Sequence, residues 1–389
     1  MSHRLSDRLA KLPPYPFVEL DRMKREAIEK GVDIINLGIG DPDQPTPQRI
    51  IDALAEAAND PTNHQYPLGT GLADFRREVA HYYLRFHRVT LDPAREVGAL
   101  IGSKEGIAHF PLAFANPGDV VLYPDPGYPV YQSSAIFAGA EPVAMPLLAE
   151  NGFLPDLDAI PADVLRRTRL MFLNYPNNPT AALAGMEFFE KVVALAGKHG
   201  FIVLHDAAYL DIAFFGEKPL SFLSVPGARE VGLELHSLSK TFNMTGWRIG
   251  FVAGNPELVA GLMAIKANVD SGVFNVVQRA GIEALQNIDI LLPEIISVYE
   301  ARLKVLDEGI RSLGWTDFTS PRSTFYVWVR NRGGRSSFEM TKVLLEECGI
   351  VTTPGTAFGA HGEGFFRIAL TTSAERIREA VERIRKAGL

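Results

Sequence analysis

Seven short apolar runs, separated by segments of helix length, dominate the chain from about residue 97 to residue 254. Each run is rich in Val, Ile, Leu and Phe, which is typical of strands buried on both faces of a mostly parallel sheet. Helices that connect such strands would cover the two faces of the sheet. The runs read VGALIG, VVLYP, EPVAMP, RLMFLNYP, FIVLHD, VGLELHSLS and RIGFVAG. The pattern predicts an α/β three-layer domain with a mostly parallel, seven-stranded sheet.

The flanking segments show helical periodicity. Before the apolar runs we predict helices over about residues 19–30 and 72–86, with a further helix between them that is capped by Thr46 and has Pro47 in its first turn. After them, residues 276–313 read as one or two helices, the longer from about Ile288 to Leu313. This long helix would bridge towards a second lobe.

The last segment mixes short strands with helices. Strand patterns occur at TFYVWV, IVTTP and FFRIAL, one helix is capped by Ser336 and Glu339, and another begins after Ser373. This pattern predicts a small α+β domain. We expect an N-terminal arm with part of the small domain over residues 1–40, a large domain over 41–285 and the small C-terminal domain over 286–389.

Composition narrows the class of protein. Hydrophobic residues make up 47% and charged residues 22% of the 389 residues, as in ordinary globular proteins. The net charge is −7 with scattered Lys and Arg, so we expect no nucleic-acid partner. No run of about 18 apolar residues and no signal-peptide core occurs, so we expect neither membrane spanning nor export. The single cysteine, Cys348, fits a reducing cytoplasm.

The most informative stretch is HSLSKTFNMTGWRIG, which begins at His236 and carries Lys240 directly after an apolar strand. A buried lysine is costly unless its amine is neutral or covalently bound, and bonding to an aldehyde cofactor achieves this. Ser237, Ser239 and Arg248 supply hydroxyls and a cation suited to a phosphate ester. The same SxxK tetrad also occurs in serine acyl-enzymes, so it does not settle the chemistry alone.

Polar residues also follow several of the other predicted strands. Asp206 ends FIVLHD and could pair with a pyridinium nitrogen, with Tyr209 donating to a ring oxygen, although an isolated Asp more often caps a turn. Asn178, held between prolines, could point to a ligand or only shape its turn. Ser103 and Lys104 follow a glycine where a helix would begin, a place that favours phosphate.

Two further residues are ambiguous when taken singly. Tyr128, in the rigid turn PDPGYP, could stack on a flat ring, although a lone aromatic is more often part of the core. Arg367 lies within the apolar strand FFRIAL, and a buried guanidinium needs either a structural carboxylate or a substrate carboxylate.

Together these residues resemble the class I and II aminotransferases of pyridoxal-phosphate fold type I over almost the whole chain. The order of the motifs carries the resemblance, from YPLGTG with Tyr66, through GSK, to the SLSK and FFR stretches. It implies that Lys240 binds pyridoxal 5′-phosphate covalently and moves the proton between the substrate α-carbon and the cofactor. It also implies that Asp206 pairs with the ring nitrogen while Asn178 and Tyr209 hold the ring oxygen.

The resemblance assigns the remaining groups as well. Ser103, Lys104, Ser237, Ser239 and Arg248 would bind the phosphate. Tyr66 would reach the phosphate of a partner subunit, which implies a homodimer. Arg367 would bind the substrate α-carboxylate, together with Asn178 and the backbone of Gly40.

Three stretches, NLGIGDPDQPTP, LIGSKEGIA and DPGYPVY, look most similar to the LL-diaminopimelate aminotransferase subgroup. That likeness implies amino transfer between LL-2,6-diaminopimelate and 2-oxoglutarate in lysine biosynthesis, with Tyr15 and Asn275 among the ligand contacts. The second arginine of aspartate-specific relatives is absent from residues 266–275. Lys104 or Tyr15 could hold a distal carboxylate instead, and aspartate, alanine or methionine remain alternative substrates.

Other functions would also account for part of the sequence. The same cofactor could serve a lyase or decarboxylase, because the protein decides which bond breaks. A scaffold protein without turnover, or a serine acyl-transferase, would leave Asp206, Asn178 and Arg367 without a shared purpose. His205 and His236 should lie on the opposite strand face from the functional residues, so we predict packing histidines and no metal.

Overall fold

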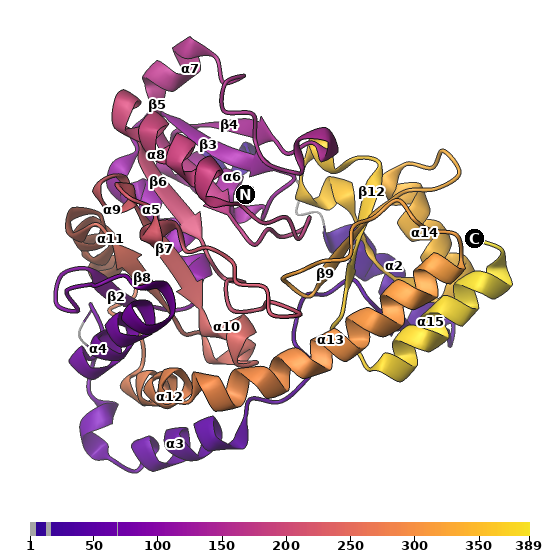
Figure 1. The fold of residues 1–389 in the computed structure, drawn as a ribbon, viewed down its shortest axis with the longest axis horizontal. Coiled ribbons are helices and arrows are strands. Elements are labelled where there is room, and N and C mark those ends of the chain that lie inside the picture. The colour runs from indigo at the N-terminus through magenta and orange to yellow at the C-terminus, as the bar shows by residue number, and fades with distance from the viewer. Residues whose placement is uncertain (1–4, 13–16, 68) are drawn as a thin grey trace, which may run out of the picture.

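A seven-stranded sheet forms the middle layer of the larger of two lobes (Figure 1). The computed structural model describes residues 5–12, 17–67 and 69–389. The strands of this sheet are β2 (Val97–Leu100), β3 (Val120–Asp125), β4 (Glu141–Pro146), β5 (Thr168–Asn174), β6 (Ile202–Asp206), β7 (Gly232–Ser237) and β8 (Gly250–Gly254). Their order is β2-β8-β7-β6-β5-β3-β4; β8 runs antiparallel to both of its neighbours, β2 and β7, and the other pairs are parallel. The predicted three-layer α/β domain with a mostly parallel, seven-stranded sheet is confirmed.

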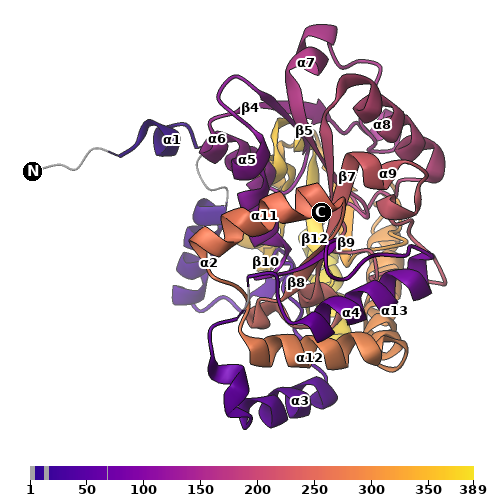
Figure 2. The same ribbon diagram turned by 90° about the vertical axis from the view of Figure 1, so that its left-hand side faces the viewer.

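Successive side chains of the central strands enter different cores, because side chains alternate between the two faces of a strand. On β5, Leu170 and Phe172 pack in the core beneath α5 (Ser103–Phe114), α6 (Val130–Ala138) and α11 (Pro256–Val269). Met171 and Leu173 pack in the opposite core, with α8 (Met186–His199) and α12 (Asn275–Gln286). Figure 2 shows α5 and α6 on one side of the sheet and α8 on the other. Burial on both faces explains why the strands read as unbroken apolar runs.

The remaining helices of the first 250 residues are α1 (Asp7–Ala10), α2 (Phe17–Glu29), α3 (Gln48–Ala58), α4 (Ala73–Tyr82) with a π-helical turn at Tyr83–His87, α7 (Ala162–Arg167), α9 (Ala228–Val231) and α10 (Leu238–Thr241). Among them, α2, α3 and α4 lie where helices were predicted, whereas α1, α7, α9 and α10 are short helices that the sequence analysis did not predict. Short 3-10 turns occur at Pro61–His64, Ala149–Asn151, Phe222–Ser224, Thr245–Trp247, Gly355–Phe358 and Ala360–Gly362.

The predicted cap of α3 is wrong. Helix α3 begins at Gln48 and Pro47 occupies its N-cap position, so Thr46 lies one residue too early to cap it. The Thr46 hydroxyl instead donates a hydrogen bond to the carbonyl of Asn243, at 2.7 Å. The Thr46 side chain, which its local preference would place at the helix N-terminus, makes a tertiary hydrogen bond instead.

The smaller lobe contains a three-stranded antiparallel sheet in the order β11-β12-β9 and a two-stranded parallel pair. Its elements are β1 (Ile35–Asn36), β9 (Tyr326–Arg330), α14 (Ser337–Cys348), β10 (Ile350–Val351), β11 (Thr353–Pro354), β12 (Phe365–Ala369) and α15 (Ala374–Ala387). Ser336 and Glu339 form the predicted capping box of α14, and Ser373 caps α15. The predicted α+β character of this lobe is confirmed.

One long helix, α13 (Ile288–Ser312), joins the two lobes (Figure 1). Ile288 and Leu291 near its start belong to a core of the large lobe, whereas Ile295, Tyr299 and Leu303 belong to the core of the small lobe. The small-lobe core also takes in Ile35 and Leu37 from the N-terminal segment. We therefore propose residues 41–285 as the large domain, with residues 1–40 and 286–389 outside it.

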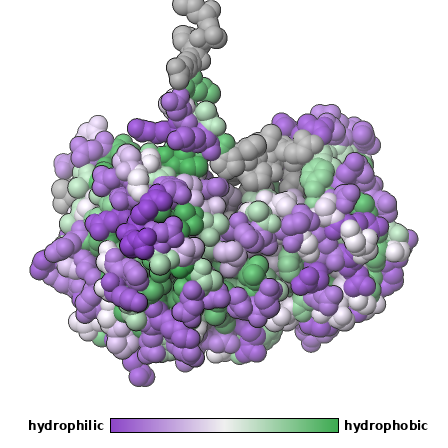
Figure 3. Space-filling view, turned by 90° about the horizontal axis from the view of Figure 1, so that it is seen from above, coloured by the Kyte–Doolittle hydropathy of each residue, from purple (hydrophilic) through white to green (hydrophobic). Residues whose placement is uncertain are grey.

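Hydrophilic side chains predominate on the molecular surface viewed in Figure 3, with hydrophobic areas scattered among them. Among the described residues, no helix combines the length and the apolar character that crossing a membrane requires.

Candidate active site

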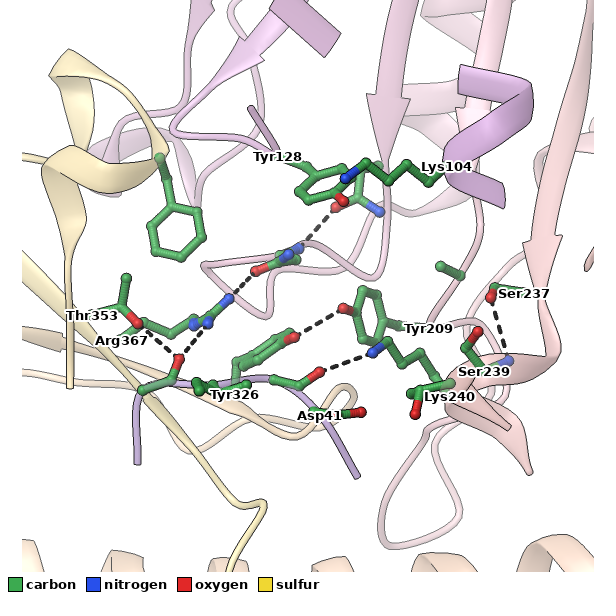
Figure 4. A pocket seen from close by; sticks show the side chains of 18 of the residues that line it. Asp41, Lys104, Tyr128, Tyr209, Ser237, Ser239, Lys240, Tyr326, Thr353 and Arg367 are labelled. Carbon is green, nitrogen blue, oxygen red and sulfur yellow. Dashed lines mark hydrogen bonds between the residues drawn. The ribbon is translucent and has the colours of Figure 1, made fainter. Parts of the chain in front are cut away.

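The carboxyl ends of the parallel strands meet at one edge of the large sheet, where ligands bind in open α/β folds. A cavity of about 450 Å³ lies at this edge, and residues of both lobes line it (Figure 4). From the predicted set it receives Gly40, Ser103, Lys104, Tyr128, Asn178, Asp206, Tyr209, Ser237, Ser239, Lys240, Arg248 and Arg367. The fold thus brings together residues that are as much as 327 positions apart in the sequence, from Gly40 to Arg367.

Lys240 lies in the short helix α10, directly after β7. Ser237 caps this helix by accepting a hydrogen bond from the amide of Ser239. The Lys240 ammonium donates a hydrogen bond to the carbonyl oxygen of Gly40, at 2.8 Å, but makes no ion pair among the described residues. Burial lowers the pKa of Lys240 to about 8, with a further lowering by the charge of Arg367 and an opposing effect of Asp41. The amine is therefore available in its neutral form near physiological pH.

Hydroxyls and cations gather at the start of α5 and around α10. Ser103, Lys104, Ser237 and Ser239 line this part of the cavity together with Arg248. The Arg248 guanidinium donates to the hydroxyl of Ser239, at 3.3 Å. A Cβ atom on Gly102 would lie 2.4 Å from that guanidinium, and Gly102 also has a φ of +72°, so only glycine suits the position. The arrangement combines a helix N-terminus with two cations, Lys104 and the hydrogen-bonded Arg248, which is a chemistry suited to a phosphate.

Asp206 is buried at the end of β6. One carboxylate oxygen accepts a hydrogen bond from the hydroxyl of Tyr131, at 2.7 Å, and the other accepts from the amide of Ala208, at 3.3 Å. Burial raises the pKa of Asp206, and the hydrogen bond from Tyr131 partly offsets this effect. A buried carboxylate without an ion-pair partner among the described residues is well suited to a cationic ligand atom.

The side chain of Asn174 holds the turn that carries Asn178 against the end of β6. The side chain of Asn174 accepts a hydrogen bond from the backbone amide of Asn178, at 2.8 Å, and donates to the carbonyl of Asp206, at 2.8 Å. The ends of β5 and β6 and the turn that carries Asn178 are thereby tied together at the cavity wall. Asn178 is thus held in its turn and also lines the cavity.

Tyr209 meets a tyrosine of the small lobe. Its hydroxyl lies 3.0 Å from the hydroxyl of Tyr326, and burial raises the pKa of Tyr209 well above the usual range. Tyr209 therefore stays protonated and can donate a hydrogen bond into the cavity.

Arg367 occupies β12 and is only 4% exposed. Its guanidinium donates to the side-chain oxygen of Asn178, at 2.7 Å, and to the carbonyl of Gly38, at 2.8 Å. It lies between two aromatic rings, 4.0 Å from the centre of Tyr326 and 4.6 Å from that of Phe358. No carboxylate within the described residues pairs with it, which favours the ligand-carboxylate interpretation over a structural ion pair.

Three predicted residues lie elsewhere. Tyr66 is 92% exposed and does not line the cavity of its own chain. Asn275 is buried at the start of α12, where its side-chain oxygen accepts a long hydrogen bond of 3.5 Å from Gln278. Tyr15 lies outside the described residues.

The cavity also receives residues that the sequence analysis did not single out. They are Asp21, Lys24, Asp41, Tyr131, Tyr326, Thr353 and Phe358, among others. Tyr131 could have been found from the motif DPGYPVY, in which it stands three residues after Tyr128. The others lie on elements whose place at the cavity depends on the packing of the two lobes.

The two histidines have structural surroundings, as predicted. One ring nitrogen of His205 lies 2.9 Å from the carboxylate of Glu234, and the other accepts a hydrogen bond from the amide of Tyr175. His236 stacks on Phe251 at 4.7 Å between ring centres. Both belong to the buried core of the large lobe.

One cluster, Glu105 with His109 and Asp270, has the spacing of metal ligands. The ammonium of Lys266 already donates to Glu105, at 2.9 Å, and to Asp270, at 2.8 Å. These carboxylates are therefore neutralised by a lysine, and Lys266 is not available to a substrate.

Comparisons with known proteins agree on one family. Residues 32–384 match the family described as aminotransferase class I and II. An LL-diaminopimelate aminotransferase of Syntrophobacter fumaroxidans is 57% identical over 381 residues, which cover 98% of each chain. The solved structure of substrate-bound BacF from Bacillus subtilis is 38% identical with a TM-score of 0.95, covering 100% of this chain and 98% of that one. A Thermus thermophilus aspartate aminotransferase variant is 28% identical with a TM-score of 0.92, covering 99% and 100%.

Proposed function

This chain belongs to the class I and II aminotransferases, and from that premise we propose that it transfers an amino group between LL-2,6-diaminopimelate and 2-oxoglutarate in lysine biosynthesis. The observation that carries the proposal is the 57% identity, over 98% of both chains, to a protein of that name. The second arginine of aspartate-specific relatives is absent from residues 266–275, which is consistent with a different amino donor.

The cavity fits pyridoxal 5′-phosphate, the cofactor of this family. We infer that Ser103, Lys104, Ser237, Ser239 and Arg248 hold the phosphate, because they form the hydroxyl-rich, cationic part of the cavity wall. Asp206 would pair with the ring nitrogen, Tyr128 would lie against the ring, and Asn178 and Tyr209 would contact the ring oxygen. When bound, the cofactor supplies an electron sink that stabilises negative charge at the substrate α-carbon.

Lys240, Arg367 and Asn178 would move the proton and bind the substrate. The amine of Lys240, with its pKa near 8, can take the proton from the substrate α-carbon and return it to the neighbouring cofactor carbon. Arg367 would bind the substrate α-carboxylate as a two-pronged donor, because a guanidinium matches the geometry of a carboxylate. Asn178 contacts Arg367 and would join it at the same carboxylate, which fixes the α-carbon near Lys240.

We further propose that the active unit is a homodimer. Tyr66 is 92% exposed and does not line the cavity of its own chain, so the phosphate contact that the resemblance gives it would require the active site of a partner subunit. The sequence has a single cysteine, Cys348, so no intrachain disulfide can form, which supports the proposal that the protein works in the reducing cytoplasm.

The lowered pKa of Lys240 makes the capture of the cofactor dependent on pH. Because only the neutral amine attacks an aldehyde, covalent uptake by the cofactor-free protein should speed up as the pH rises and level off above about pH 8. Absorbance of the bound cofactor, recorded at a series of pH values after rapid mixing, measures this rate. A rate that continues to rise towards about pH 10.4, the ordinary pKa of lysine, would contradict the proposed environment of Lys240.

The decisive test of the substrate is a spectral titration of the purified holoenzyme. LL-diaminopimelate and glutamate should each convert the bound cofactor to its amino form, whereas alanine, aspartate and methionine should do so only at much higher concentrations. Conversion by alanine, aspartate or methionine instead would leave the family assignment intact and reject the proposed donor. Formation of ammonia together with a 2-oxo product from a single substrate would indicate a lyase.

A further inference from the structure

Helix α2 contributes two side chains of opposite charge to the cavity wall. Asp21 and Lys24 both line the cavity, alongside residues of the cofactor and carboxylate regions. They are three residues apart on the helix, so their side chains point to the same face. The outer part of the cavity therefore presents a carboxylate and an ammonium side by side.

Neither charged side chain has a partner among the described residues. The side chains of Asp21 and Lys24 make no hydrogen bond or ion pair with any described residue, whereas Arg22 and Glu26 of the same helix pair with each other. The other charged groups that line the cavity interact with other residues or lie in the part proposed to hold the phosphate. Asp41 acts on the charge of Lys240, Arg248 contacts Ser239, and Lys104 stands at the start of α5.

We propose that Asp21 and Lys24 form a subsite for the far end of a substrate that carries a second amino-acid group, and this inference rests on the proposed function. With the near carboxylate on Arg367, the far ammonium would meet Asp21 and the far carboxylate would meet Lys24. One acidic and one basic side chain complement a zwitterion, whereas a second arginine would complement only a dicarboxylate. The subsite thus provides selectivity that residues 266–275 lack.

Substrate analogues separate the two contacts. L-lysine has the far ammonium of LL-diaminopimelate but lacks the far carboxylate, and L-2-aminopimelate has the far carboxylate but lacks the ammonium. Dissociation constants of the holoenzyme for all three compounds can be measured from the change in cofactor absorbance. Asp21→Asn should weaken LL-diaminopimelate and L-lysine about tenfold and leave L-2-aminopimelate unchanged. Lys24→Met should weaken LL-diaminopimelate and L-2-aminopimelate about tenfold and leave L-lysine unchanged.

Matched controls come from the same helix and the residue after it. Glu29→Gln and Lys30→Met remove the same charges outside the cavity and should change none of the three constants. Melting temperatures of all four variants identify any loss of folding. Equal effects of Asp21→Asn on L-lysine and L-2-aminopimelate, or unchanged binding of LL-diaminopimelate by both cavity variants, would overturn the subsite but leave the proposed function standing. A wild-type protein that does not bind LL-diaminopimelate would overturn both.

Discussion

Lys240→Ala should lower the rate of amino transfer by about four orders of magnitude or more. The substitution removes the amine that would bind the cofactor and the base that would move the α-proton, and no other lysine among the described residues contacts Gly40 at this place. Visible absorbance of the covalently bound cofactor should be lost at the same time. Single-turnover rates with LL-diaminopimelate, together with the absorption spectrum, measure both effects.

The fold should survive this change. In the absence of cofactor Lys240 is a desolvated amine, so its removal relieves a cost and the melting temperature of the cofactor-free protein should not fall. Lys191→Ala, which removes an exposed lysine of α8, serves as the control and should keep full activity. Retention of substantial turnover by Lys240→Ala would reject the proposed mechanism.

Arg367→Ala should weaken binding of amino-acid substrates by a factor of about 100 to 1,000, because it deletes the buried guanidinium that we propose binds the substrate carboxylate. Visible absorbance of the covalently bound cofactor should persist, since Arg367 makes no hydrogen bond to Lys240 or to the residues proposed to hold the phosphate. The dissociation constant for glutamate, obtained by spectral titration, gives the size of the loss.

Arg330 offers a matched control for this experiment. It lies on the adjacent strand β9, is exposed, and stacks on the ring of Phe365 at 4.8 Å. Arg330→Ala removes a guanidinium from an aromatic ring without reaching the cavity, so glutamate binding should be unaffected. Equal dissociation constants for Arg367→Ala and the wild type would show that another group binds the α-carboxylate.

The sheet and the residues at its edge could be predicted because both follow from local sequence. Strands such as β5 are buried on two faces, so their apolar runs are continuous, and the polar residues that end them mark the edge where a ligand can bind. Lys240 and Asp206 were identifiable on this ground. Burying an amine or a carboxylate without an ion-pair partner costs free energy. A functional site is a physical reason for a sequence to retain such a group in the interior.

Residues whose role depends on the meeting of the two lobes could not be found in this way. Tyr326 stands in an apolar strand of the small lobe, and nothing near it in the sequence indicates that its hydroxyl meets that of Tyr209. Asp21 and Lys24 belong to a helix that the periodicity did predict, but the direction of its polar face is decided by packing. Thr46 was assigned to the wrong partner because a contact 197 residues away competes with the local cap.

Helix α13 couples the unfolding of the two lobes. The same rigid element supplies Leu291 to the core of one lobe and Ile295 to the core of the other, one helical turn apart. Helix formation is cooperative, so neither core can come apart without fraying a helix that the other core needs. Calorimetry should therefore record one unfolding transition for the two lobes, and a substitution that destabilises the small lobe should lower the stability of the cavity in the large lobe as well.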